Sequence, residues 1–417
     1  MEKFKQTHFR LGGADGFRAI ACLLVVIVHL VGNMFREGQA PWLQNVLSFF
    51  SMGNVGVSIF FVLSGFLLSY PFWKKYLEGD AFPSIKQYAL RRFARIAPGY
   101  YVAIIVAVIA ANHFELVTEH FWARLIAGIT FTSGFHYITF FPSEMNGPLW
   151  SISFEMFCYL LMPLFMFALF RFFGKNRSFL TGILFWIGVF FLILILNQLI
   201  HSLFVLSEEG RGFQYGIIGG AKFWMPNYNP IGLFGHFALG IFAAGVSVRL
   251  FQVSEKTKRF KHFGGFDLLC LGALFLSFAL LGIMRYFGEF DFSLQRQPFY
   301  FPMYATFIAI SLCTAAHTRW AAKILDNPFF RFTSKISFGL YIWHYLIMRV
   351  SSLTWAKEYR WMNMTDLGKW ASISLVILVV SYVFATISFY LVEKPVLDWS
   401  HGRRGVFNKR RETGLGA

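Results

Sequence analysis

Residues 16–35 read GFRAIACLLVVIVHLVGNMF, and this stretch indicates the class of fold. An α-helix needs about 20 apolar residues to cross the hydrocarbon core of a bilayer, and this segment has that length with only two basic side chains, Arg18 and His29. Nine further apolar segments follow, although residues 97–111 and 336–348 are short and need tilt or snorkelling flanks to span a membrane. The ten segments are residues 16–35, 55–73, 97–111, 147–171, 179–206, 231–248, 268–284, 299–316, 336–348 and 370–392.

The composition of the whole chain agrees with this interpretation. Of its 417 residues, 56% are hydrophobic and 14% are charged, against about 25% charged residues in ordinary soluble domains. So few charged side chains cannot cover the surface of a soluble protein of this length, which excludes a soluble globular enzyme, a disordered chain and a coiled coil. The sequence therefore predicts an all-α polytopic membrane helical bundle with about ten transmembrane helices.

The distribution of Lys and Arg predicts the orientation of this bundle. The formal net charge is +17, and 27 of the 38 Lys and Arg residues fall on one set of alternating loops, against 10 on the other set. Basic residues accumulate on cytoplasmic loops, so we expect both termini in the cytoplasm. The same tendency explains the positive charge without nucleic acid, because the sequence has no basic module outside the apolar segments.

Residues 125–141 and the C-terminal end differ from these ten segments. Residues 125–141 are apolar but rich in Thr, Ser, Gly and His, and an eleventh full span here would break the alternation of charge. We therefore expect a re-entrant or surface-lying segment, with the eleventh span as the alternative. We also expect one integral membrane domain over residues 1–400, and a short basic cytoplasmic tail over residues 401–417 that contacts lipid headgroups.

Ionisable side chains inside membrane segments are costly and mark functional sites. Arg18 and His29 are 11 residues apart, so they share one helix face and are separated by roughly 16.5 Å along its axis. Asp15, three residues before Arg18, can pair with it on that face. Three polar residues from other segments fall at about the depth of His29, and we expect the four groups to face one another or a wet cavity. These three are Ser64, Glu155 and His344.

These residue types suit proton transfer on a phosphate-bearing substrate. Histidine is the side chain best matched to proton transfer near neutral pH, and a carboxylate beside it fixes its tautomer. Arg91, Arg92 and Arg95 form a basic cluster on the predicted cytoplasmic side, and guanidinium groups bind phosphates through paired hydrogen bonds.

Six motifs, in order along the chain, resemble those of the membrane acyltransferase-3 family. Arg18 and His29 are similar to its Arg-x10-His signature, and GPLWSISFE at residues 147–155 resembles its Leu-Trp-Ser-x-Ser-x-Glu motif. The other four are FFVLSGFL at residues 60–67, RRFARIAPGYY at 91–101, SFGLYIWH at 337–344 and EKP at 393–395. Together they extend from residue 15 to residue 395.

The resemblance implies a multi-pass O-acyltransferase of the bacterial inner (plasma) membrane, with no metal and no tightly bound cofactor. Such an enzyme moves an acyl group, usually acetyl, from cytoplasmic acyl-CoA (acetyl-CoA) to a hydroxyl group of a cell-surface or exported carbohydrate or glycolipid. The family's activity-linked residues correspond to Arg18 and His29, and we add Glu155 to the catalytic set. We expect donor binding by the basic cluster, and a pocket that also includes Asp15, Ser64, Trp150, Ser153 and His344.

Several alternatives stay open. A transporter or flippase of a lipid-linked sugar or acyl intermediate would also carry buried polar groups. Glu155 is either catalytic or a structural partner of an arginine such as Arg124. Trp150 and Ser153 also suit packing and helix hydrogen bonding, and the basic cluster also suits a membrane anchor. His29 acts either as general base or as covalent acyl carrier, and an oligomer is possible. Because about 20 residues follow the last segment, we expect a form without a C-terminal esterase-like domain.

Overall fold

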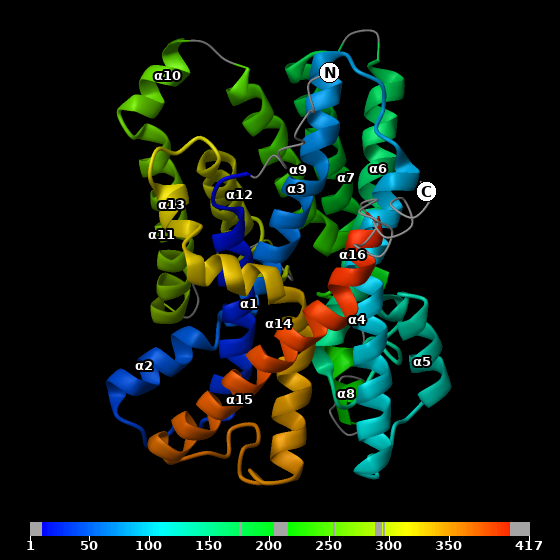
Figure 1. The fold of residues 1–417 in the computed structure, drawn as a ribbon, viewed down its shortest axis with the longest axis vertical. Coiled ribbons are helices and arrows are strands. Elements are labelled where there is room, and N and C mark those ends of the chain that lie inside the picture. The colour runs from blue at the N-terminus through cyan, green and yellow to red at the C-terminus, as the bar shows by residue number, and fades with distance from the viewer. Residues whose placement is uncertain are drawn as a thin grey trace, which may run out of the picture.

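The computed structural model describes residues 11–174, 177–203, 216–252, 255–287, 294 and 297–400, and it is all-helical over these residues (Figure 1). The described part contains no β-strand, only one isolated bridge between Met34 and Met364. The predicted basic tail at residues 401–417 lies outside the described residues. The predicted all-α fold is therefore confirmed.

Each of the ten predicted segments is helical. The corresponding helices are α1 (Ala14–Val31), α3 (Gly56–Glu78), α4 (Ile85–His113), α6 (Trp150–Phe172), α7 (Phe179–Leu203), α9 (Pro230–Phe251), α11 (Gly265–Phe287), α12 (Met303–Ala315), α14 (Pro328–Leu353) and α15 (Leu367–Ser388). Within the described ranges, eight helices are long and apolar enough to cross a membrane; α12 has only 13 residues, and α14 is not among the eight. The count of ten crossings and the cytoplasmic position of both termini stay predictions.

Shorter elements connect these helices. They are α2 (Pro41–Phe50), α5 (Phe121–Ile129), α8 (Gly216–Trp224), α10 (Glu255–His262), α13 (Ala321–Leu325), α16 (Lys394–Ser400), the 3₁₀ turns η1 (Gly53–Val55), η2 (Ser133–Phe135), η3 (Gly147–Leu149) and η5 (Pro298–Tyr300), and the π-helical turn η6 (Phe389–Glu393).

The segment at residues 125–141 contains no long helix. Helix α5 has nine residues and is about 13.5 Å long, which is less than half the thickness of a bilayer core. The chain then turns through η2 and returns toward α6. Arg124 of α5 donates hydrogen bonds to this returning segment, to the Phe141 carbonyl at 2.8 Å and to Glu144 at 2.6 Å. This geometry does not support an eleventh span, and it assigns Arg124 to Glu144 rather than to Glu155.

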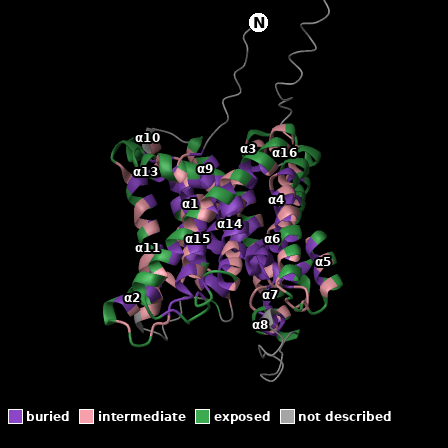
Figure 2. Cartoon of the chain, turned by 60° about the horizontal axis from the view of Figure 1, so that its bottom comes forward, coloured by how far each residue is buried: buried purple, intermediate pink, exposed green. Residues whose placement is uncertain are grey.

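Helices α1, α3, α9 and α14 carry much of the buried core, and Figure 2 shows buried residues concentrated along the middle of the bundle. Helix α7 is different, because it exposes large apolar side chains along its length, as a helix in contact with lipid does. These include Leu180, Leu184, Phe191, Ile195 and Leu199.

Two glycines allow α3 and α9 to approach closely. A Cβ atom built on Gly65 would lie 2.0 Å from the Phe237 carbonyl oxygen, and one built on Gly240 would lie 2.0 Å from the Val62 carbonyl oxygen. The contact is reciprocal, backbone against backbone. Small residues at such crossings are typical of membrane helix pairs, which associate through close packing.

We expect Gly65→Ala and Gly240→Ala each to lower the free energy of unfolding by about 1–3 kcal/mol, because the added methyl group forces the two backbones apart. Thermal unfolding in detergent micelles measures the effect. Gly188→Ala on α7 is the matched control, since nothing lies within 4 Å of its Cβ position. Equal melting temperatures for the three variants would contradict this account of the helix crossing.

Candidate functional site

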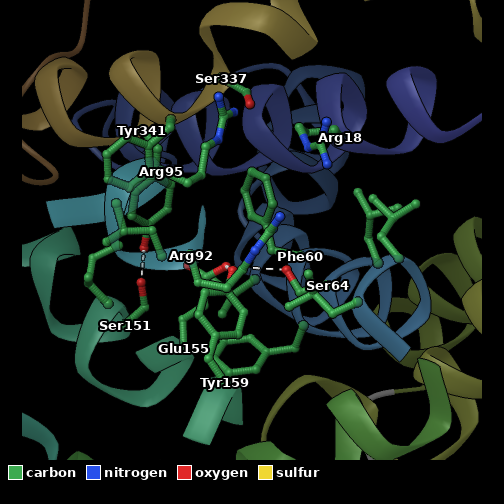
Figure 3. Close-up of a pocket in the computed structure, with 18 residues that line it drawn as sticks. Arg18, Phe60, Ser64, Arg92, Arg95, Ser151, Glu155, Tyr159, Ser337 and Tyr341 are labelled. Atoms are coloured by element: carbon green, nitrogen blue, oxygen red, sulfur yellow. Dashed lines mark hydrogen bonds between the residues drawn. The ribbon is translucent and has the colours of Figure 1, made fainter. Parts of the chain in front are cut away.

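A pocket opens between α1, α3, α4, α6 and α14, with about 790 Å³ of empty space including its mouth (Figure 3). Its walls are largely apolar, but several polar side chains from different helices converge on it. The lining residues are Arg18, Val57, Phe60, Phe61, Leu63, Ser64, Leu67, Leu68, Arg92, Arg95, Ile96, Ser151, Ile152, Glu155, Tyr159, Ser337, Phe338 and Tyr341.

Three arginines give this pocket its positive charge. Arg18 comes from α1, and Arg92 and Arg95 are one turn apart on the same face of α4. Over the described residues, Arg92 and Arg95 form no hydrogen bond and no ion pair, and Arg18 forms one long hydrogen bond of 3.4 Å to the Ser334 hydroxyl. Arg91, the third member of the predicted cluster, points to another side of α4, where it is exposed and does not line the pocket.

Glu155 is the acidic residue of the pocket lining. Its carboxylate accepts a hydrogen bond from Ser64 of α3 at 3.2 Å and another from the Tyr159 hydroxyl, one turn further along α6. Three guanidinium groups around one carboxylate leave the pocket with an excess of positive charge. Since Arg92 and Arg95 form no hydrogen bond to other described residues, their N–H donors remain available, and the pocket is suited to bind an anion.

His29 and His344 form a separate pair beside this pocket. His29 Nδ1 lies 2.8 Å from the Val25 carbonyl and 3.0 Å from His344 Nε2, and His344 Nδ1 lies 3.0 Å from the Leu340 carbonyl. Neither histidine lines the pocket, but the His344 ring centroid is 6.2 Å from that of Tyr341, which does.

This arrangement determines the tautomers of the neutral pair. A backbone carbonyl only accepts, so His344 carries its proton on Nδ1, and its Nε2 is an acceptor. His29 Nδ1 faces two acceptors, the Val25 carbonyl and His344 Nε2, and must therefore be protonated. The lone pair of His29 consequently resides on Nε2, which is the ring nitrogen able to accept a proton.

We expected four polar groups to face one another in one layer, but the structure divides them into two clusters. Ser64 pairs with Glu155, and His29 pairs with His344. The expectation of a carboxylate beside His29 is wrong for the described part of the chain, where backbone carbonyls orient both imidazoles instead. The reason is that Tyr159 and Ser64 turn the Glu155 side chain toward α3 and the arginines.

Asp15 and Arg18 meet through a third residue. The Ser334 hydroxyl of α14 donates to Asp15 Oδ1 at 2.7 Å and accepts the hydrogen bond from Arg18 Nη1. The predicted Asp15–Arg18 pairing on one helix face is thus bridged by a serine from another helix.

Trp150 and Ser153, predicted as pocket residues, do not line the pocket. The Trp150 ring stacks on Phe140 with centroids 5.4 Å apart. The Ser153 hydroxyl donates to the Phe131 carbonyl at 2.7 Å and accepts from the Gly134 amide at 3.0 Å. Both hold the segment at residues 125–141 against α6, as the packing alternative predicted.

The pocket also contains polar residues that sequence analysis did not select. Ser151 and Tyr159 lie four residues before and after Glu155, on the same face of α6, and the Ser151 hydroxyl contacts the Tyr341 hydroxyl at 2.6 Å. The sequence signal that could have identified them is the spacing of polar side chains at intervals of four residues in an otherwise apolar helix. Ser337 and Tyr341 show the same interval on α14.

Known proteins are similar in sequence to most of this chain. The peptidoglycan O-acetyltransferase OatA of Listeria monocytogenes is 25% identical over 402 residues, which cover 92% of this chain and 55% of the relative. A provisionally named O-acetyltransferase of Staphylococcus aureus is 24% identical over 370 residues, covering 83% of this chain and 52% of that protein. The provisionally named peptidoglycan O-acetyltransferase YrhL of Bacillus subtilis is 23% identical over 407 residues, with 94% and 55% covered.

This chain spans about half the length of these relatives. No solved structure matches it. The family described as acyltransferase domain matches residues 11–386, nearly the whole chain. The predicted family is thus confirmed, and the chain belongs to this membrane acyltransferase family.

Proposed function

We propose that this protein is a membrane-embedded O-acyltransferase, acting as an O-acetyltransferase, that transfers the acyl group of a cytoplasmic acyl-CoA to a hydroxyl group of a cell-envelope carbohydrate. The observation that supports this most directly is the pocket in which Arg92 and Arg95, which form no hydrogen bond or ion pair with the described residues, lie beside Arg18. The names of the relatives suggest acetyl as the group and peptidoglycan as the first acceptor to test.

The arginines supply the donor site in this proposal. Under the predicted orientation they lie toward the cytoplasm, where acyl-CoA is available, and they bind its phosphates through charge-assisted hydrogen bonds. His29 lies 11 residues beyond Arg18 on α1, about 16.5 Å along the helix axis. In this proposal the part of acyl-CoA that carries the thioester extends over this distance. It follows the pocket wall where the rings of Phe60 and Tyr341 pack edge to face, with centroids 5.9 Å apart.

The proposed chemistry takes place at His29 Nε2. This nitrogen removes the proton of the acceptor hydroxyl as its oxygen attacks the thioester carbonyl carbon. The tetrahedral intermediate then breaks its carbon–sulfur bond, and the imidazolium returns the proton to the leaving thiolate. His344 and the Val25 carbonyl keep a proton on His29 Nδ1, so that Nε2 is the nitrogen that accepts the hydroxyl proton and returns it. Transfer of the acetyl group to Nε2 before the acceptor binds would use the same tautomer.

We expect purified protein in detergent to form an O-acetylated carbohydrate and free coenzyme A from acetyl-CoA and peptidoglycan fragments, as detected by mass spectrometry and thiol release. No gradient exists in micelles, so a transporter gives neither product. Folded protein that moves a substrate across vesicle membranes, but leaves the mass of every acceptor unchanged, would contradict the proposal and favour transport. Comparison of envelope glycans from cells with and without the protein identifies the native acceptor.

A further inference from the structure

The start of α1 is fixed against the connection between α13 and α14. The Gly13 amide, which precedes the first residue of α1, donates a 3.0 Å hydrogen bond to Asp326 Oδ2. A Cβ atom built on Gly16 would lie 2.3 Å from the Leu325 carbonyl oxygen, so the glycine allows the two backbones to meet here. The first turn of α1 is therefore held beside the beginning of α14 by contacts of its own backbone.

Ser334, which is 1% exposed on α14, connects two charged residues at the start of α1. Its hydroxyl donates a 2.7 Å hydrogen bond to Asp15 Oδ1 and accepts one of 3.4 Å from Arg18 Nη1. A hydroxyl group has one proton and two lone pairs, and here the carboxylate takes the proton. A lone pair is consequently left for the guanidinium group.

Other buried serines of α14 use their hydroxyl groups differently. Ser337 donates to the Ser334 carbonyl at 2.9 Å, and Ser352 donates to the Arg349 carbonyl at 2.8 Å, each three residues earlier in the helix. Serine in a helix readily makes such a bond to its own backbone. Asp15 offers Ser334 a charged acceptor instead, and hydrogen bonds to charged groups are stronger than those between neutral groups. The carboxylate therefore directs the Ser334 hydroxyl away from its own helix and toward α1.

Of Asp15, Ser334 and Arg18, the arginine is the residue that lines the pocket (Figure 3). It shares this lining with Arg92 and Arg95, and three like charges repel one another. Without an anchor, this repulsion favours rotation of the Arg18 guanidinium away from the other two. The Ser334 hydroxyl binds one of its five N–H donors, which leaves the remaining donors for a ligand.

We propose that Ser334 is a positioning residue, whose hydroxyl holds the Arg18 guanidinium in place for the donor phosphates, and that Asp15 acts by directing this hydroxyl. This inference rests on the proposed acyl-CoA donor site. The hydrogen-bonded relay from Asp15 through Ser334, and not direct charge pairing, then sets the orientation of Arg18. Such preorganisation improves affinity, because the ligand does not have to order the side chain as it binds.

The test uses the purified full chain and coenzyme A as the probe, with binding measured by titration calorimetry. Ser334→Ala removes the relay, and we expect coenzyme A to bind about fivefold more weakly, the usual net effect of one hydrogen bond. The KM for acetyl-CoA should rise more than kcat falls. Ser352→Ala is the matched control, because it removes a buried α14 hydroxyl that bonds to the backbone of its own helix. We expect this control to bind coenzyme A as the wild type does.

Two substitutions of Asp15, which is half-buried, separate the relay from a direct charge effect. Asp15→Asn keeps an oxygen that accepts the Ser334 proton but removes the charge, so we expect coenzyme A affinity to fall less than about twofold. Asp15→Ala removes the acceptor and should match the loss in Ser334→Ala. Equal losses for Asp15→Asn and Asp15→Ala overturn the relay, because they show that the charge alone matters.

A double-mutant cycle separates positioning from a merely structural role. In the Arg18→Ala background, Ser334→Ala should weaken coenzyme A binding no further, because the group that it positions is absent. Wild-type affinity in the Ser334→Ala single variant overturns the inference, and so does an equal loss in both backgrounds. Thermal unfolding verifies the fold of each variant, and the two Asp15 substitutions decide the matter if Ser334→Ala does not fold.

The failure of this inference and the failure of the proposed function give different results. If the variants follow the expected pattern of coenzyme A binding but the wild type forms no acylated product, the relay is supported and the proposed function is contradicted. Absence of coenzyme A binding by the wild type overturns both.

Discussion

His29→Ala should lower kcat for acyl transfer by about 10²–10⁴-fold, the usual contribution of a general base. The substitution removes Nε2, the nitrogen that its neighbours leave unprotonated, while the Val25 carbonyl that orients it is already bonded within a helix. The variant should still insert and fold. Steady-state release of coenzyme A by purified protein measures the effect, and thermal unfolding verifies the fold.

His113→Ala is the matched control, because His113 is exposed at the C-terminal end of α4 and is not in the pocket. We expect it to retain wild-type activity. His344→Ala should have an intermediate effect, up to about 10²-fold, since it removes an orienting neighbour of His29 and leaves Nε2 in place. Wild-type turnover in His29→Ala would refute the role of this imidazole.

The same variant helps to decide between general base and acyl carrier. Incubation with labelled acetyl-CoA in the absence of acceptor should leave wild-type protein unlabelled if His29 is a base. Stoichiometric label that His29→Ala lacks would instead establish a covalent carrier. Both outcomes keep the proposed transfer and differ only in the order of its steps.

The Arg92→Ala, Arg95→Ala double variant should raise the KM for acetyl-CoA by about 10²-fold or more. Each charge-assisted hydrogen bond to a phosphate contributes about 1.5–3 kcal/mol, and 1.4 kcal/mol corresponds to a factor of ten. These two guanidinium groups have no hydrogen bonds to lose within the described protein, so the fold should tolerate their removal. Initial rates over a range of acetyl-CoA concentrations provide the KM.

Arg91→Ala is the control for this prediction. It removes the same charge from the same turn of α4, but its side chain is exposed and outside the pocket lining. We expect less than a twofold change in KM, because an exposed charge is screened by salt within about 10 Å. An equal rise in KM for Arg91→Ala would show that the arginines act as general positive charge, without a defined phosphate site.

The sequence by itself determined the helices and their contents. Apolar segments of membrane length are local signals, because every backbone group in lipid must bond within its own helix, and all ten were found as helices. The motifs likewise identified the family, and the spacing of Arg18 and His29 placed them on one helix. The helical periodicity of α4 also places Arg91 on a different face from Arg92 and Arg95. We nevertheless expected all three arginines in one cluster.

Only the tertiary structure decided which polar groups meet. Glu155 faces Ser64, Tyr159 and the arginines, and His29 faces His344, because the lateral placement of helices depends on close packing such as the Gly65–Gly240 crossing. The sequence does not distinguish residues at equal depth in the membrane. Hydropathy indicates a residue's position along the membrane normal, but it does not indicate which neighbouring helix the residue faces within the membrane plane.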